Sequence, residues 1–142
     1  MINSQIVHPD TGVVLFTEKE LSCRETGVIK LAEGFEDHLL DYRITYNRPM
    51  PATSICRSGP YNTAVGGEPG SFHICDTTKT FRITNGCCAI DWVMPADPAV
   101  RGEAIKLALN KGWRVGLNWQ KNFIHMDRGP DWGYVPVTVF PY

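Results

Sequence analysis

Two stretches of the chain carry apolar residues at the intervals of three and four that an amphipathic helix requires. The first predicts a core-facing helix over residues 27–43, with apolar positions at Val28, Leu31, Ala32, Phe35, Leu39 and Tyr42. The second predicts a helix between Asp97, an N-cap acid followed by proline, and Gly112, a C-terminal stop. A third, short helix is expected after Thr17, because Thr17 and Glu20 form a capping-box sequence.

Short runs of β-branched and apolar residues predict the strands, and most of these runs lie in the second half of the chain. In one of them a period of two places Ala89, Asp91 and Val93 on the same face. Helices early and mid-chain, followed by strands late, favour an α+β fold with a small antiparallel sheet. The expected strands cover residues 52–56, 88–93, 113–119, 123–127 and 134–139.

The length of 142 residues suits a single domain with one core. Residues 1–16 are interpreted as an N-terminal arm or short edge strand that leads into a domain formed by residues 17–142. Glycine and proline frame residues 57–72, which are predicted to form a long ordered loop of the kind that often carries function. Residues 74–86 begin with β-formers and end in Asn-Gly, which indicates an excursion in the form of a hairpin.

The composition argues against several classes of partner. The chain is 43% hydrophobic and 20% charged with a net charge of −1, so we expect no binding to nucleic acid or to an anionic membrane surface. No apolar run approaches a membrane span, and the polar start of the chain lacks the features of a signal peptide, so neither membrane insertion nor signal-directed export is expected. Five cysteines without a C-x-x-C spacing predict reduced, mostly buried thiols.

Three separated residues, His73, Asp91 and His125, supply the ligand types of an open zinc site. Two imidazoles and one carboxylate would leave the fourth position of a tetrahedral zinc ion for water or substrate. A single histidine on a buried face is more often satisfied by core hydrogen bonds, so the residues taken one by one leave both interpretations open. His38 has no spaced partner and is interpreted as a solvated helix residue.

Several short motifs follow one another along the chain. They are Phe16-Thr17-Glu18-Lys19-Glu20-Leu21, Thr53-Ser54 with Arg57, Tyr61-Asn62-Thr63-Ala64-Val65-Gly66-Gly67, Ser71-Phe72-His73, Ala89-Ile90-Asp91 and Phe123-Ile124-His125-Met126-Asp127. In these motifs and their order the chain resembles the superfamily of zinc D-Ala-D-Ala carboxypeptidases and L-alanyl-D-glutamate endopeptidases. These enzymes cleave peptidoglycan and include many phage endolysins. The resemblance spans most of the chain.

The resemblance implies a role for each residue of the site. His73, Asp91 and His125 would bind Zn²⁺, and the sheet would carry these ligands with the helices packed on one side. Arg57 would hold a carboxylate of the peptidoglycan stem peptide, since a planar guanidinium can grip a carboxylate with two hydrogen bonds. Asn62 and Ser71 are expected to fix the loop or to orient a metal ligand rather than to react.

The spacing of the first two ligands departs from the family pattern. Eighteen positions separate His73 from Asp91, more than in the family. The excursion over residues 74–86 accounts for the difference if it loops out and returns without moving either ligand. A further hypothesis is that it lines the substrate cleft.

A second departure concerns the general base. The family has an acidic residue three positions before its last histidine, where this chain has Asn122. Asparagine accepts no proton at neutral pH, and general-base assistance is typically worth about 10²–10⁴-fold in rate. Asp127, Glu68 and Asp131 are the candidate substitutes, and Asp127 is preferred because it shares a strand face with His125. The alternative roles for Asp127 are to orient a ligand or to pair with the arginine that follows it.

The sequence therefore predicts a zinc peptidase that acts on peptidoglycan stem peptides. Such a protein would stay in the host cytoplasm until release, as a phage lysin, or would belong to a virion together with other virion proteins. The main alternative is a non-catalytic or weakly active zinc-binding structural module of the same fold, which Asn122 favours. A domain without zinc, in which both histidines serve the core, is the third interpretation.

Overall fold

The computed structural model describes residues 1–76 and 84–142. The helices are α1 Glu18–Leu21, α2 Phe35–Tyr46, α3 Gly59–Ala64 and α4 Pro98–Asn110, with a 3-10 helix η1 at Gly129–Trp132. The strands are β1 Ile6–Val7, β2 Val14–Phe16, β3 Ala52–Ser54, β4 Ala89–Val93, β5 Arg114–Asn118, β6 Phe123–Asp127 and β7 Val139–Pro141. The α+β fold class is therefore confirmed.

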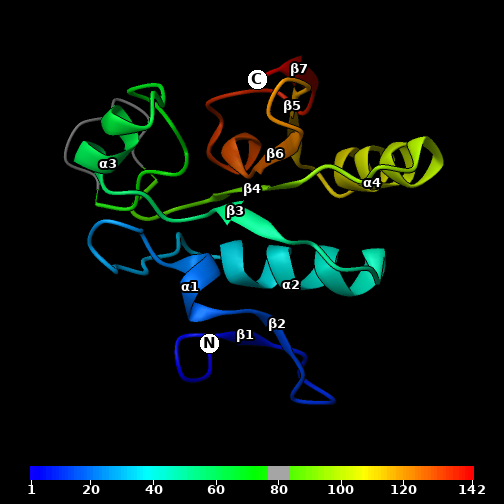
Figure 1. Cartoon of the computed structure of the whole chain (residues 1–142), viewed down its shortest axis with the longest axis horizontal. Coiled ribbons are helices and arrows are strands. Elements are labelled where there is room, and N and C mark those ends of the chain that lie inside the picture. Colours follow the sequence, from blue (N-terminus) through cyan, green and yellow to red (C-terminus); the bar gives the residue numbers. More distant parts are fainter. Residues whose placement is uncertain (77–83) are drawn as a thin grey trace.

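The main sheet has the strand order β3-β4-β6-β5-β7 (Figure 1). Three of its strand pairs are antiparallel, as expected: β3 with β4, β4 with β6, and β6 with β5. The edge strand β7 pairs parallel with β5, so the sheet is mixed rather than wholly antiparallel. Strand β6 returns the chain antiparallel to β5, so the segment between β6 and β7 that contains η1 starts and ends at the same end of the sheet and carries the chain past β5 to its outer edge.

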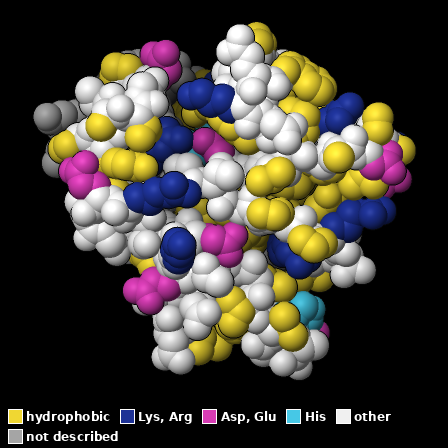
Figure 2. All heavy atoms as spheres, viewed as in Figure 1, with side chains coloured by type: hydrophobic (Ala, Val, Ile, Leu, Met, Phe, Trp, Pro, Cys, Tyr) yellow, Lys and Arg dark blue, Asp and Glu magenta, His cyan; other side chains and the backbone are white. Residues whose placement is uncertain are grey.

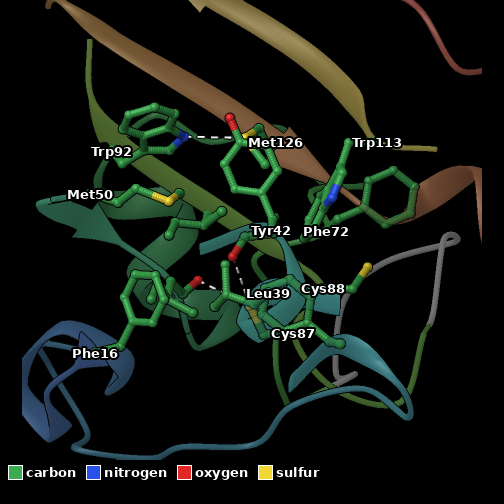
Figure 3. Close-up of a cluster of buried hydrophobic side chains, with 14 of the residues drawn as sticks. Phe16, Leu39, Tyr42, Met50, Phe72, Cys87, Cys88, Trp92, Trp113 and Met126 are labelled. Atoms are coloured by element: carbon green, nitrogen blue, oxygen red, sulfur yellow. Dashed lines mark hydrogen bonds between the residues drawn. The ribbon is translucent and has the colours of Figure 1, made fainter. Parts of the chain in front are cut away.

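Side chains alternate between the two faces of this sheet. Trp92 on β4, Met126 on β6 and Val115 on β5 are buried on one face. Helices α2 and α4 cover that face: the Tyr42 ring lies 6.4 Å from the Trp92 ring and its hydroxyl donates to the Ala104 carbonyl oxygen at 2.8 Å. Figure 3 shows Tyr42, Trp92 and Met126 together, with the Trp92 indole N–H directed at the Met126 sulfur. The prediction that helices pack on one side of the sheet holds for α2 and α4, whereas α3 lies toward the opposite face, where Tyr61 lines a groove with Asp91.

The predicted N-terminal arm, residues 1–16, contains a small hairpin. Strands β1 and β2 pair antiparallel, with Ile6 opposite Phe16. Both side chains are buried in the same hydrophobic core as α1 and α2. Burial of two large apolar side chains stabilises this hairpin against the remainder of the chain by about 1.5–3 kcal/mol for each side chain.

The predicted capping signals are confirmed. The Thr17 hydroxyl accepts a hydrogen bond from the Glu20 N–H while the Glu20 carboxylate accepts one from the Thr17 N–H, a complete capping box at α1. Glu20 also accepts a hydrogen bond from the Ala52 N–H at 2.9 Å, so α1 is joined to the outer edge of β3. At α4 the Asp97 carboxylate caps the helix, and Gly112 follows its end with φ +84°.

The prediction of a helix over residues 27–43 is wrong in its first part. Helix α2 begins at Phe35, after Gly34 in the left-handed region with φ +82°. The backbone of residues 30–32 pairs instead with Cys87, through the Cys87 N–H to the Lys30 carbonyl and the Ala32 N–H to the Cys87 carbonyl, both at 2.8 Å. Tertiary hydrogen bonds thus outweigh the helical spacing of the apolar side chains.

Two other expected elements differ in extent. The predicted loop 57–72 contains the short helix α3, which Ser58 caps through its side chain at the Tyr61 N–H. The strand predicted over residues 134–139 overlaps the observed strand β7 only at Val139, where β7 begins. The hairpin predicted within 74–86 falls largely on residues 77–83, which lie outside the described residues. All five cysteines are free and buried, as predicted. Over the described part of the chain no helix combines the length and apolar character needed to cross a membrane.

Candidate metal centre

The sheet face opposite the helices carries two of the predicted metal ligands side by side. Asp91 on β4 pairs directly with His125 on β6, and His125 pairs in turn with Gly116 on β5. Directly paired residues of neighbouring strands point to the same side of a sheet, so this row brings a carboxylate and an imidazole into contact. Asp91 is 2% exposed and His125 is 1% exposed.

The third predicted ligand, His73, comes from the loop before β4 rather than from the sheet. Its carbonyl accepts the Arg57 N–H at 2.9 Å, and the Phe72 carbonyl accepts the Cys88 N–H at 2.9 Å. The Ser71 hydroxyl accepts a hydrogen bond from the His73 backbone N–H at 3.2 Å, which agrees with the loop-fixing role predicted for Ser71. The loop thus holds the His73 imidazole over β4, where one ligand atom from each of His73, Asp91 and His125 lies within 4.8 Å of the others.

Hydrogen bonds define which nitrogen of each imidazole faces the centre. The Nδ1 atom of His73 lies 2.7 Å from the Ile55 carbonyl oxygen, an acceptor, so Nδ1 must donate. The Nε2 atom of His125 lies 2.7 Å from Oδ2 of Asp127, which fixes Nε2 as the donor there. The remaining nitrogens, Nε2 of His73 and Nδ1 of His125, lie 3.0 Å and 2.9 Å from the same Oδ1 atom of Asp91.

This arrangement is suited to a cation. In the neutral imidazoles the two inward nitrogens bear lone pairs, which face a carboxylate oxygen that also bears lone pairs. Acceptors at these distances repel one another unless each imidazole takes a second proton or a cation lies between the three atoms. A single metal ion satisfies all three at once, and an outer partner on the second nitrogen is the usual way in which a metal-binding histidine is oriented.

The charge state of Asp91 agrees with a cation-binding role. Burial raises the pKa of the Asp91 carboxyl. The charge of His73 and hydrogen bonds from both imidazoles, which require the doubly protonated rings of the metal-free site, outweigh burial and hold the pKa below its usual range. Arg57 adds a hydrogen bond to Oδ2 at 3.0 Å. The carboxylate is therefore ionised, with Oδ1 toward the imidazoles and Oδ2 toward the guanidinium.

Asp127, the preferred candidate for the general base, lies behind His125 and away from solvent. Its Oδ2 atom accepts from His125 at 2.7 Å and from Arg114 at 2.8–2.9 Å, and its Oδ1 atom accepts the Gly129 N–H at 2.9 Å. Burial raises the pKa of the Asp127 carboxyl. The hydrogen bond from His125 and the charge of Arg114 outweigh burial and hold the pKa below its usual range. With both oxygens engaged and the side chain 0% exposed, Asp127 is placed to orient His125 rather than to take a proton from water.

Arg57 is part of the centre rather than a surface residue. Its guanidinium donates to the Ser54 hydroxyl at 2.9 Å and to the Asn62 amide oxygen at 3.2 Å, in addition to Asp91. Asn62 in turn donates to the Glu68 carbonyl at 2.9 Å, so it contacts both the guanidinium and the loop. These contacts hold the guanidinium plane at the edge of the site, where it can meet a carboxylate.

A groove with a volume of about 940 Å³ opens over the centre, with Asp91 and His125 in its lining. Arg24, Arg57, Arg114 and Lys121 contribute four cationic groups to the lining, whereas Glu68 and Asp91 contribute two acidic ones. Figure 2 shows the hollow with Lys and Arg side chains around it, between the part of the molecule that carries α3 and the part that carries β5 and β7. A cleft lined mainly by one sign of charge favours ligands of the opposite sign.

The other candidate bases lie in different places. Glu68 lines the groove and is exposed. Asp131 lies on η1, where it pairs with Arg128 at 2.8 Å and lies 3.5 Å from His38. Asn122 lines the groove at the β5–β6 turn, and among the groove-lining residues described only Glu68 and Asp91 are acidic.

Three contributors to the site were not anticipated from the sequence: the Ile55 carbonyl, Arg114 and Tyr142. Arg114 sits opposite Asp127 in the β5–β6 register, and the Tyr142 ring stacks on His125 with centroids 4.1 Å apart. A correct register for β5 and β6 would have revealed Arg114, because paired residues share a face. No sequence signal identifies the Ile55 carbonyl.

Comparisons of the chain with models of known protein families, with curated proteins and with solved structures found no match.

Proposed function

We propose that this protein is a zinc-dependent peptidase that cleaves peptidoglycan stem peptides, of the D-Ala-D-Ala carboxypeptidase or L-Ala-D-Glu endopeptidase type. The observation that carries the proposal is the convergence of His73 Nε2, His125 Nδ1 and Asp91 Oδ1, each oriented by a partner on its far side. Two imidazole nitrogens and one carboxylate oxygen match the ligand preference of catalytic zinc, which keeps one position open. The interpretation without a metal explains this convergence poorly, since it requires two doubly protonated buried imidazoles.

The groove supports a substrate that carries carboxylates. Stem peptides contain several acid groups, and the cationic lining of Arg24, Arg57 and Lys121 is complementary to them. Arg57 is next to the ligand Asp91 and is held in a fixed plane, so it is the group we assign to the carboxylate nearest the scissile bond.

A zinc ion held by His73, Asp91 and His125 would supply a Lewis acid that polarises a peptide carbonyl. The protein groups supply orientation: Asp127 and Ile55 fix the imidazoles, and Arg57 fixes both Asp91 and the substrate.

Glu68 is the group we assign to proton transfer. It is an exposed carboxylate in the groove lining, whereas Asp127 has both oxygens engaged and Asp131 is paired on η1. A general base must reach the attacking water from the open side of the site. Among the candidates only Glu68 combines an ionisable oxygen with access to the groove.

The second candidate function is a zinc-binding structural module that binds the cell wall without cleaving it. Asn122 favours this alternative, because it occupies the groove position at which the resembling enzymes have an acidic base. The module and the peptidase would bind the metal through the same three residues, so only activity separates them.

The test is release of peptides from purified sacculi. Wild type, His125→Ala and His38→Ala are incubated with sacculi and zinc, and released fragments are measured by mass spectrometry. His38 is a partly buried helix histidine away from the centre, with a side chain 44% exposed, so its substitution controls for loss of an imidazole elsewhere. We expect release by wild type and His38→Ala and none by His125→Ala, with fragment masses that identify the bond. Equal background release from all three would contradict the peptidase and leave the module.

A further inference from the structure

The final segment of the sheet places an aromatic ring directly on a proposed metal ligand. The Tyr142 ring stacks on the His125 imidazole with centroids 4.1 Å apart and an angle of 14° between the planes. Phe140 approaches the same imidazole edge-on, at 6.0 Å and 78°. His125 is therefore covered on the groove side by aromatic rings, while Asp127 holds its Nε2 atom from behind.

The backbone fixes the position of these rings. Strand β7 pairs parallel with β5, with Phe140 opposite Gly116, and the Tyr142 N–H donates to the Leu117 carbonyl at 3.0 Å. Phe123 packs edge-on against Tyr142 at 5.7 Å. The Tyr142 ring is thus held by its own backbone and by a neighbouring ring, rather than resting loosely on the surface.

Gly116 makes room for this arrangement. A Cβ atom at position 116 would lie 2.9 Å from atoms of both Phe140 and Tyr142, closer than side-chain carbons approach one another. Gly116 also pairs directly with His125 in the β5–β6 register. The absence of a side chain at this point of the row lets the two aromatic residues cover His125.

Tyr142 also lines the groove, together with Arg57, the proposed substrate anchor. The contact between the Tyr142 ring and the His125 imidazole therefore lies in the lining of the groove.

We propose that Tyr142 is a positioning residue of the metal centre, with a ring that holds His125 in the plane needed to bind the metal. This inference rests on the proposed metal centre and adds a role for a residue outside the motifs that led to it. Imidazole orientation is set by outer contacts, and loss of such a contact typically costs about 10–100-fold in metal affinity.

The test measures zinc affinity by competition with a chromophoric chelator in wild type, Tyr142→Phe, Tyr142→Leu and Gly116→Ala. Trp119→Ala is the control, since Trp119 is 63% exposed and packs on Arg101 away from the ligands. We expect Tyr142→Leu to weaken zinc binding by about tenfold or more and Tyr142→Phe to retain it within about twofold. Gly116→Ala should weaken binding with the tyrosine still present, because the added methyl group displaces the ring.

A second measurement does not depend on the metal. In metal-free wild type the His125 ring protons should show the upfield NMR shift of a stacked imidazole, and Tyr142→Leu should remove it. Wild-type zinc affinity in both Tyr142→Leu and Gly116→Ala would overturn the inference and leave the metal centre intact. Failure of wild type to bind zinc would contradict the proposed function instead, while the ring-proton shifts would still decide whether Tyr142 positions His125.

Discussion

The two histidines of the centre present different nitrogens to it, Nε2 from His73 and Nδ1 from His125. Each choice follows from the acceptor on the far side of the ring, the Ile55 carbonyl in one case and the Asp127 carboxylate in the other. A carbonyl is neutral, whereas a carboxylate paired with Arg114 increases the basicity of the imidazole. His125 should therefore depend more strongly on its partner than His73 does.

Substitution Asp127→Asn tests that dependence. The amide lacks the negative charge that Asp127 places beside His125 and cannot form the ion pair with Arg114, so we expect zinc affinity to fall by about 10–100-fold. Asp131→Asn is the control, because Asp131 pairs with Arg128 and not with a ligand. Zinc content and affinity are measured by competition. Loss of hydrolysis with wild-type zinc affinity would return Asp127 to the role of general base.

The assignment of Glu68 predicts the opposite pattern. Glu68→Gln should lower peptide release by about 10²–10⁴-fold, the usual value of general-base assistance, while zinc affinity stays at the wild-type level. Glu25→Gln, at another exposed glutamate, is the control. Rates are compared on one purified stem peptide with matched zinc loading. A Glu68→Gln variant as active as wild type would exclude Glu68 from proton transfer.

At the scale of elements, β6 organises the site because its two faces carry different chemistry. Ile124 and Met126 are buried toward the helices, whereas His125 and Asp127 face the centre. Strand β4 repeats the pattern with Trp92 on one face and Asp91 on the other. A shift of register by one residue would bury the ligands among the helices, so the apolar face also fixes the position of the metal centre.

Gly86, in the turn that returns the chain to β4, should be important for the stability of the fold. Gly86 has φ +130°, and a Cβ atom there would lie 2.7 Å from the backbone of Leu31 and Ala32. Gly86→Ala should therefore lower the free energy of unfolding by about 1–3 kcal/mol through backbone strain, with a further cost for the contact. Gly102→Ala in α4 is the matched control. It meets nothing within 4 Å and should raise the stability by about 0.5–1 kcal/mol.

Both variants are measured by urea unfolding of metal-free protein, so that a change in zinc affinity does not enter the result. Equal stability of Gly86→Ala and wild type would show that the approach of residues 30–32 to Gly86 is looser than these distances indicate.

At the scale of the whole molecule, metal binding should stabilise the fold. The ligands come from β4, β6 and the loop at His73, so a metal ion joins segments far apart in the chain. Zinc at about one hundred times its Kd should raise the free energy of unfolding by about 2.7 kcal/mol. Thermal unfolding with zinc and with a chelator measures the difference. The shift should be absent in His125→Ala and retained in His38→Ala, and a shift in both variants would place the zinc elsewhere.

Much of this architecture could be predicted from local patterns. The capping box at Thr17 and the span of α4 between Asp97 and Gly112 follow from backbone chemistry within a few residues. The alternation of apolar and polar positions in β6 correctly identified which side chains share a face with His125. These features depend on neighbours in sequence, so the sequence specifies them.

The helix predicted over residues 27–43 shows where local pattern is insufficient. Its apolar spacing is helical, yet residues 30–32 adopt an extended pairing with Cys87 because that pairing satisfies their backbone groups in the core. The local pattern was also insufficient for Asp127. Its role depends on the hydrogen bonds that Arg114 and the Gly129 N–H donate to its two oxygens. Each outcome depends on a partner many residues away.

The sequence by itself determined the α+β class and the main helix caps, because these follow from side-chain chemistry and short-range periodicity, and its motif resemblance indicated the three candidate ligands. Only the tertiary structure decided which nitrogen each histidine presents, that Asp127 supports His125, that Glu68 faces the groove and that Tyr142 covers the site. Strand register and loop path set those contacts, and both arise from packing across the whole core rather than from any one stretch of the chain.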